Sequence, residues 1–97
     1  MRPQKLAVLK ENKNQAGIYR WVNITNNKSY IGSSVNLSRR LRDYYSLSFL
    51  EIETKKNNSN IYRALLKYGY SRFKLEILEY CKIDILIERE QYYLDTI

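Results

Sequence analysis

The strongest constraint on the fold is a pair of short segments, residues 17–24 and 28–33, that flank Thr25-Asn26-Asn27. Both segments are rich in β-branched and aromatic residues, which are typical of strands. Asparagine tolerates the positive φ angles that tight turns require. The pattern therefore predicts a β-hairpin.

The two faces of this hairpin follow from the alternation of side chains along a strand. With an even-numbered loop, odd positions of the first strand share a face with even positions of the second. One face then carries Tyr19, Trp21, Tyr30 and Gly32. The other face carries Ile18, Val22, Ile24 and Ile31, and we expect it to lie against the core. We expect Trp21 to cover the sheet rather than to stack on a base.

Two helices are predicted after the hairpin. Asn36 is the expected N-cap of the first helix. Its stripe at helical spacing consists of Leu37, Arg40, Leu41 and Tyr44. The second helix begins after Ser59 and ends at Gly69, a residue type that is common at helix C-termini. Its apolar face consists of Ile61, Ala64, Leu65 and Tyr68.

A strand and a last helix follow. Residues 72–77 alternate apolar and charged side chains, which predicts a strand with one buried face. The last helix runs from about Asp84, its expected N-cap, to about Asp95. Its apolar positions are Leu86, Ile87, Tyr93 and Leu94, and Glu90 lies in the middle of that stripe.

The length of 97 residues leaves room for one domain with one modest core. We expect a mobile basic arm over residues 1–15 and a single domain over residues 16–97. The element order predicts an α+β fold, a small three-stranded antiparallel sheet flanked by helices in the order β-β-α-α-β-α. No apolar run is long enough to span a bilayer, and we expect no membrane partner.

Composition limits the chemistry that is open to this chain. It has no histidine, so histidine-based hydrolytic sites are excluded. The single cysteine, Cys81, has no partner for an internal disulfide, and we expect a packing role for it. The net charge of +7 favours a polyanionic partner such as nucleic acid, although a basic surface without a ligand is the simpler alternative.

A carboxylate on a core-facing stripe needs compensation, because an unpaired buried charge is costly. Two interpretations of Glu90 remain open. It either forms a buried ion pair with an arginine that ties the helix to the sheet, or it binds a metal ion at a cleft beside the hairpin.

Several segments resemble one known family. The tripeptides Gly17-Ile18-Tyr19 and Tyr30-Ile31-Gly32 stand at the spacing of the GIY-YIG nucleases. Three further runs, YIGSSVNLSRRLRDYY, NSNIYRALLKYGYSRFKLEILEY and IEREQYYLD, resemble the GIY-YIG domains of intron-encoded homing endonucleases, above all those of fungal mitochondria. The resemblance covers about residues 17–97. The family fold that it implies agrees with the element order predicted above.

The resemblance implies a DNA endonuclease that uses one metal ion, Mg²⁺ or Mn²⁺, on double-stranded DNA. It assigns Tyr19 as general base for the attacking water and Tyr30 as a residue that positions water and phosphate. Arg40 matches the family's helix arginine, and Tyr44 matches the histidine or tyrosine one turn further on. Glu90 matches the metal-binding glutamate.

These roles are chemically reasonable for phosphodiester hydrolysis. An arginine and a bound divalent ion stabilise negative charge on the phosphate oxygens. The phenol of Tyr19 is the weak point, because only about a thousandth of a tyrosine is ionised at neutral pH. Neighbouring cations have to stabilise its phenolate. The simpler alternative is that Tyr19 and Tyr30 are ordinary strand residues.

The two signature glycines have different expected roles. Gly32 lacks a side chain and would let backbone and phosphate approach closely, with a bulge or strand end as the alternative. Gly17 is expected to serve turn geometry. Candidate phosphate contacts, each of which is otherwise a solvated charge, are Lys28, Arg39, Arg42, Lys55, Lys56 and Lys67.

Two alternatives to the nuclease remain: a non-catalytic nucleic-acid-binding module that retains the fold, and an RNA-directed splicing factor. The resemblance ends with the last helix and does not include the family's return segment or separate DNA-binding domain, so we expect either an isolated catalytic domain or a truncated reading frame. Low target specificity is expected from this. We also expect a monomer. The frequency of Asn, Lys, Ile and Tyr fits an AT-rich coding sequence, which favours a mitochondrial or phage origin. We expect a mitochondrial location, with a phage or bacterial cytoplasm as the alternative.

Overall fold

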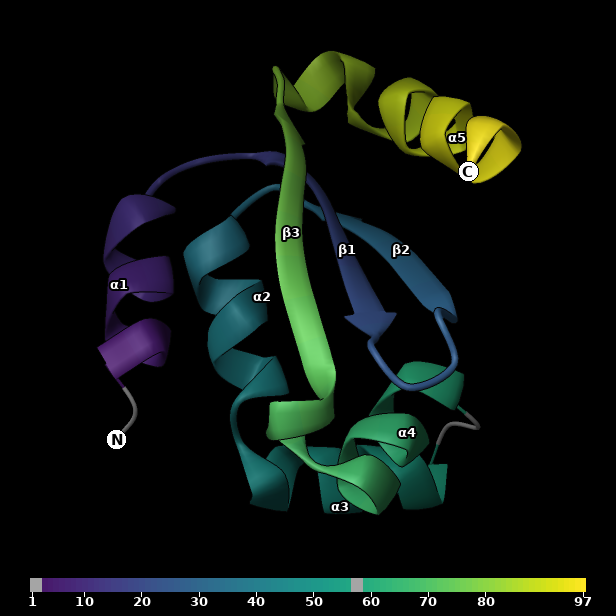
Figure 1. Ribbon diagram of the computed structural model, residues 1–97. Helices are drawn as coiled ribbons and strands as arrows, with labels where there is room; N and C mark the ends of the chain where they lie inside the picture. The colour runs from purple at the N-terminus through teal and green to yellow at the C-terminus, as the bar shows by residue number, and fades with distance from the viewer. Residues whose placement is uncertain (1–2, 57–58) are drawn as a thin grey trace.

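A three-stranded antiparallel sheet forms the centre of the molecule (Figure 1). The computed structural model describes residues 3–56 and 59–97. The strands are β1 (Gly17–Asn23), β2 (Ser29–Ser34) and β3 (Phe73–Tyr80), in the order β2-β1-β3. The predicted hairpin is confirmed, and the expected parity of its faces is too, since Tyr19 lies opposite Gly32 and Trp21 opposite Tyr30.

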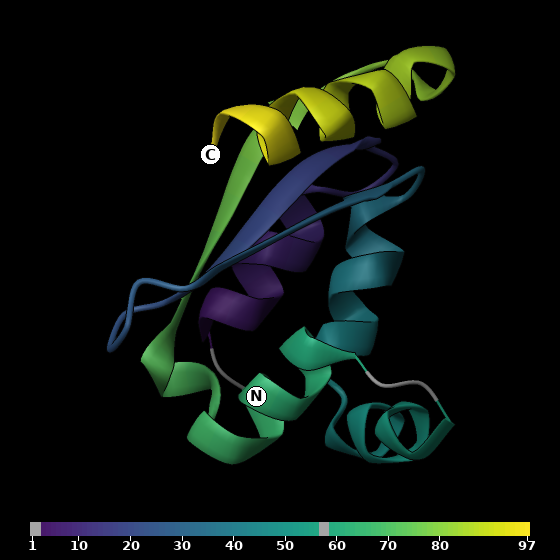
Figure 2. The ribbon, with the colours of Figure 1, turned by 90° about the vertical axis from the view of Figure 1, so that its right-hand side faces the viewer.

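Helices cover both faces of this sheet. They are α1 (Pro3–Glu11), α2 (Leu37–Tyr44), α3 (Leu47–Lys56), α4 (Asn60–Tyr68) and α5 (Leu86–Thr96). Figure 2 shows α5 on one face of the sheet and α1 and α2 on the other. The α+β class with a three-stranded antiparallel sheet and flanking helices is confirmed. No helix in the described part of the chain has the length and apolar character needed to cross a membrane.

Two helices were not expected from the sequence. The predicted arm over residues 1–15 is wrong for residues 3–11, which form α1, and Asn12 after it is only 1% exposed. The helix α3 lies between the two helices that were predicted. Its stripe is weak, because Leu50 is buried whereas Leu47 and Ile52 are more than half exposed.

The main core lies on the face of the hairpin that was expected to point away from it. Tyr19 and Trp21 are 3% and 2% exposed and pack in one cluster with residues of α2 and α4, whereas Ile24 is 57% exposed. Ile18 is fully buried on the other face, outside that cluster. The correction has a physical cause: α2 and α4 present aromatic rings to the sheet, and aromatic side chains of the hairpin match them.

The helix caps predicted from the sequence are confirmed for α2 and α4. The Asn36 side chain accepts a hydrogen bond from the Arg39 backbone nitrogen at 3.2 Å. Ser59 caps α4, and Gly69 ends it with a φ of 81°. The expected cap of α5 is wrong, because Asp84 lies in the 3₁₀ turn Ile83–Ile85 and makes no capping bond.

Residue Asn12 tests whether α1 is docked on the domain. Its side chain donates to the Val8 carbonyl at 2.7 Å and accepts from the Tyr80 hydroxyl at 2.8 Å. Asn12→Ala leaves that hydroxyl without its partner, so the free energy of unfolding should fall by about 1–3 kcal/mol in urea denaturation. Lys13→Ala, at an exposed site, should change it by less than about 0.5 kcal/mol. Equal values for the two variants would contradict the docking of α1.

Candidate active site

The first tyrosine of the signature lies directly over the last glycine. Tyr19 is in the central strand, and its ring crosses the backbone of β2 at Gly32. A Cβ atom at Gly32 would lie 2.6 Å from Cζ of Tyr19, far inside van der Waals contact. Gly32 therefore makes room for the phenol of Tyr19, in addition to any approach of a phosphate.

Gly17 also has a packing role, which differs from the turn role expected for it. It lies in β1, and a Cβ there would overlap the carbonyl oxygen of Glu79 in β3. The pairing of β1 with β3 is irregular between Ile18 and Tyr19. The missing side chain lets the two strands approach next to this irregularity.

Tyr19, Tyr44 and Arg40 form one connected cluster. The hydroxyl oxygens of Tyr19 and Tyr44 are 2.9 Å apart. Arg40 donates from Nη2 to the Tyr44 hydroxyl at 3.4 Å and also to the hydroxyl of Tyr62. Its guanidinium carbon lies 4.5 Å from the centre of the Tyr44 ring. The structure thus brings together three of the residues that the sequence singled out.

The sequence of α2 explains this meeting. Residues four apart in a helix lie on the same face, which places Arg40 next to Tyr44. Leu37 and Leu41 are fully buried on that helix and hold it against the sheet. The Tyr44 ring packs edge-on to the Tyr19 ring, with centres 5.5 Å apart.

The hydrogen bonds of this cluster have a preferred direction, from Arg40 to Tyr44 and from Tyr44 to Tyr19. A guanidinium only donates, so the Tyr44 oxygen accepts from Arg40 and its own O–H is left to donate to Tyr19. Burial raises the pKa of Tyr19, although the Tyr44 hydrogen bond and the Arg40 charge act in the opposite direction. The charge of Arg40 acts on the phenolate in the direction expected from the sequence, but burial has the larger effect. Tyr19 is protonated at neutral pH.

The other two pKa values follow the same balance. Burial raises the pKa of Tyr44 as well, so this residue is a hydrogen-bond donor at neutral pH. Burial lowers the pKa of Arg40, but the phenol oxygens of Tyr44 and Tyr19 outweigh that effect and raise it overall. Arg40 stays charged.

Glu90 belongs to α5, on the face of the sheet opposite to α2 (Figure 2), and it contacts the residue of β2 that follows Gly32. Its Oε1 accepts a hydrogen bond from the hydroxyl of Ser33, the neighbour of Gly32. Within residues 7–56 and 59–97, Glu90 forms no ion pair. The arginine beside it, Arg89, pairs with Glu79 instead, at 2.7 Å. The Glu90 carboxylate is half-buried, and none of the cations whose side chains the structure describes pairs with it, so the ion-pair interpretation is wrong for that part of the chain.

Tyr30 is not part of the phenol and guanidinium cluster. It is half-buried on β2, and its ring centre lies 6.5 Å from that of Phe73. Among the described residues, no hydrogen bond joins its hydroxyl to Tyr19, Tyr44 or Arg40.

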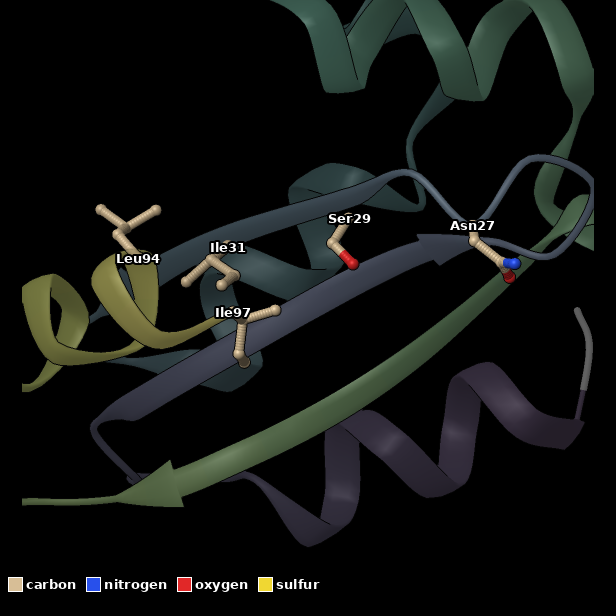
Figure 3. A pocket seen from close by; sticks show the side chains of 5 residues that line it. All are labelled: Asn27, Ser29, Ile31, Leu94 and Ile97. Atoms are coloured by element: carbon tan, nitrogen blue, oxygen red, sulfur yellow. The ribbon is translucent and has the colours of Figure 1, made fainter.

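Two hollows open at the surface. One of about 210 Å³ opens beside the cluster and is lined by Ser34, Val35, Asn36, Arg39, Arg40 and Asp43. The other, of about 330 Å³, lies between β2 and the end of α5 and is lined by Asn27, Ser29, Ile31, Leu94 and Ile97 (Figure 3). Only the first contains a residue of the cluster.

The candidate phosphate contacts are all exposed. Arg39 lines the hollow beside Arg40, and Arg42 is on the same helix. Lys28 follows the hairpin turn, and its backbone nitrogen donates to the Asn26 side chain at 2.9 Å. The remaining three stand in the last turns of α3 and α4: Lys55, Lys56 and Lys67.

The acidic groups could hold a metal ion only with help from a ligand. The described residues contain no cluster of three or more carboxylates, cysteines or histidines. Magnesium, however, is often bound through one or two carboxylates together with substrate phosphates and water. The uncompensated carboxylate of Glu90 fits that mode.

Sequence reasoning missed two residues of the site, Tyr62 and Ser33. Tyr62 is 7% exposed and packs in the core, whereas Tyr68, which was expected on the buried face of this helix, is 40% exposed. The spacing of Tyr62 three residues before Leu65 was the available signal. Ser33 had no signal, because its contact with Glu90 spans 57 positions of the chain.

Comparisons with known proteins agree with this arrangement. The model of the GIY-YIG catalytic domain matches residues 15–97. A probable intron-encoded endonuclease 1 of Neurospora crassa is 37% identical over 68 residues, which are 70% of this chain but only 20% of that protein.

Solved structures are similar as well. Two structures of the catalytic domain of the homing endonuclease I-TevI, one of them a mutant, superpose with TM-scores of 0.64 and 0.63 at 29% and 31% identity. Each match covers 84% of this chain, and 82% and 87% of the respective structure. The match to the family model extends over most of the sequence, including both signature strands, and the chain therefore belongs to the GIY-YIG catalytic domain family.

Proposed function

We propose that this domain hydrolyses phosphodiester bonds in double-stranded DNA, as the catalytic module of an intron-encoded homing endonuclease. The observation that carries the proposal is the cluster of Tyr19, Tyr44 and Arg40 beside an open hollow. The relatives named as endonucleases support it. The Neurospora relative and the AT-rich composition also support a mitochondrial location.

Arg40 is the residue that stabilises the charge of the phosphate. Its guanidinium is half-buried and lines the hollow beside α2. Two hydrogen bonds leave from Nη2, and the other donors of the fork remain for phosphate oxygens. A fixed, partly desolvated donor set of this kind stabilises a phosphoryl transition state better than a mobile surface arginine does.

Tyr19 accepts the proton of the attacking water in its phenolate form. The donor chain from Arg40 through Tyr44 ends at its oxygen, so loss of the Tyr19 proton strengthens both hydrogen bonds. The chain offsets part of the effect of burial on the pKa of Tyr19. Tyr30, two residues before Gly32 on β2, orders water and phosphate.

Glu90 would hold one Mg²⁺ or Mn²⁺ ion together with the phosphate and water. Such an ion supplies Lewis-acid stabilisation of the phosphate. The hydroxyl of Ser33 orients the Glu90 carboxylate through its hydrogen bond. DNA itself is attracted by the exposed Lys and Arg side chains through counterion release.

Supercoiled plasmid with Mg²⁺ provides the main test. Wild-type protein should nick it, and Arg40→Ala should lower the rate by about a hundredfold or more, because a charged donor to the transition state is lost. Lys13→Ala changes an exposed residue outside the cluster, and this control should retain full activity. Equal nicking by all proteins would indicate a contaminant, and binding without nicking by the wild type would favour the non-catalytic module.

The pH dependence of nicking tests the role of Tyr19. Since burial places its pKa above the ordinary value of about 10, the phenolate fraction should rise about tenfold per pH unit from pH 6.5 to 9 without a plateau. The nicking rate should follow it. Tyr19→Phe should lose about 10²–10⁴-fold and show no such slope. Tyr93→Phe, which removes a hydroxyl on α5, should keep the slope. A wild-type rate that is flat with pH would exclude Tyr19 as the base.

Binding of Mn²⁺ in the presence of uncleaved DNA tests Glu90 independently of turnover. After subtraction of the Mn²⁺ that the same DNA binds alone, paramagnetic titration should show one protein-dependent site, and Glu90→Gln should weaken it at least tenfold, because the anionic ligand is lost. Glu88→Gln, an exposed residue of the same helix, is the matched control and should bind as the wild type does. Equal affinity in both variants would remove the metal role of Glu90.

A further inference from the structure

The guanidinium of Arg40 has a second partner besides Tyr44. Tyr62 comes from α4, and its hydroxyl accepts from the same Nη2 atom. The guanidinium carbon lies 4.5 Å from the ring centre of Tyr44 and 5.5 Å from that of Tyr62. Two aromatic faces and two hydroxyl oxygens therefore fix one end of the fork.

Tyr62 is itself held rigidly. It is 7% exposed, and its ring packs edge-on to Tyr44 at 5.5 Å and to Phe49 at 5.9 Å. A ring with neighbours on both sides loses little further freedom when it binds a cation. Tyr62 is thus a fixed acceptor for Arg40, whereas Tyr44 also forms a hydrogen bond with the hydroxyl of Tyr19.

The donors of the Arg40 guanidinium fall into two groups, those that bind the tyrosines and those that do not. Arginine has five N–H donors in a planar fork, and both tyrosines bind the Nη2 end. The Nη1 and Nε donors make no hydrogen bond with the described residues. Without Tyr62 the side chain would keep one long bond to Tyr44, at 3.4 Å, and its plane could turn.

We propose that Tyr62 is a positioning residue that fixes the plane of the Arg40 guanidinium, so that its remaining donors face the scissile phosphate. The role in cleavage rests on the proposed function. The bond between the two side chains does not depend on it. Tyr62 acts through Arg40 and does not take part in proton transfer.

The test uses Tyr62→Phe, which keeps the ring and its packing and removes only the hydroxyl. Under single-turnover conditions with saturating protein, the nicking rate should fall about 10–100-fold, the effect of a lost hydrogen bond to a charged group. The protein concentration that gives half the maximal rate should stay within twofold. Tyr93→Phe, which loses a hydroxyl bond to Glu79, is the matched control and should nick as the wild type does.

A double-mutant cycle separates positioning from general loss of structure. In an Arg40→Lys background, Tyr62→Phe should lower the rate by less than about twofold, because the fork that it positions is gone. An additive loss in that background, or a wild-type rate in Tyr62→Phe alone, would overturn the proposal.

Nuclear magnetic resonance gives a readout that needs no cleavage. Rotation about the Nε–Cζ bond of Arg40, which exchanges Nη1 and Nη2, should be slow in the wild type and at least tenfold faster in Tyr62→Phe. Equal rotation in the two proteins would overturn the proposal. Slow rotation in a wild-type protein that does not nick DNA would support the Tyr62–Arg40 contact and count against the proposed function alone.

Discussion

The absence of a side chain at Gly32 is the constraint on which the site depends. It allows the ring of Tyr19 to lie across β2, so that the phenol oxygen reaches Tyr44. Tyr44 in turn contacts Arg40, and Arg40 contacts Tyr62. Any side chain at this position would displace the ring of Tyr19. Its hydroxyl would then lose the hydrogen bond with Tyr44.

The site is also part of the hydrophobic core. Tyr19, Tyr44 and Tyr62 belong to the same buried cluster as Trp21 and the leucines of α2. This placement holds the groups rigidly, which favours catalysis by preorganised donors. It also has a cost, because burial raises the pKa of a phenol that is expected to work as a base. The hydrogen bond from Tyr44 and the positive charge of Arg40 are what this chain provides against that cost.

Local signals in the sequence predicted the elements that define the site. The Asn-rich turn, the alternation along the strands, the cap at Asn36 and Gly69 depend on neighbouring residues, and each was found where expected. The choice of the core face was not local, since Tyr and Trp are both good strand formers and good core residues. The helices α1 and α3 have weak stripes, and tertiary packing decides them. Tyr62 and Ser33 join the site through contacts across 22 and 57 positions, which no short pattern encodes.

The position of β2 at the edge of the sheet has a consequence for the behaviour of the chain in solution. Neighbouring residues of a strand point to opposite faces. Gly32 therefore leaves room for the ring of Tyr19 on the face that α2 covers, whereas Ser33 donates a hydrogen bond to Glu90 of α5 on the other face. Side chains from both faces of the sheet therefore depend on two adjacent residues of this one strand. A second polypeptide could pair its backbone with this edge. Such pairing would place a foreign chain directly beside the two residues that hold Tyr19 and Glu90.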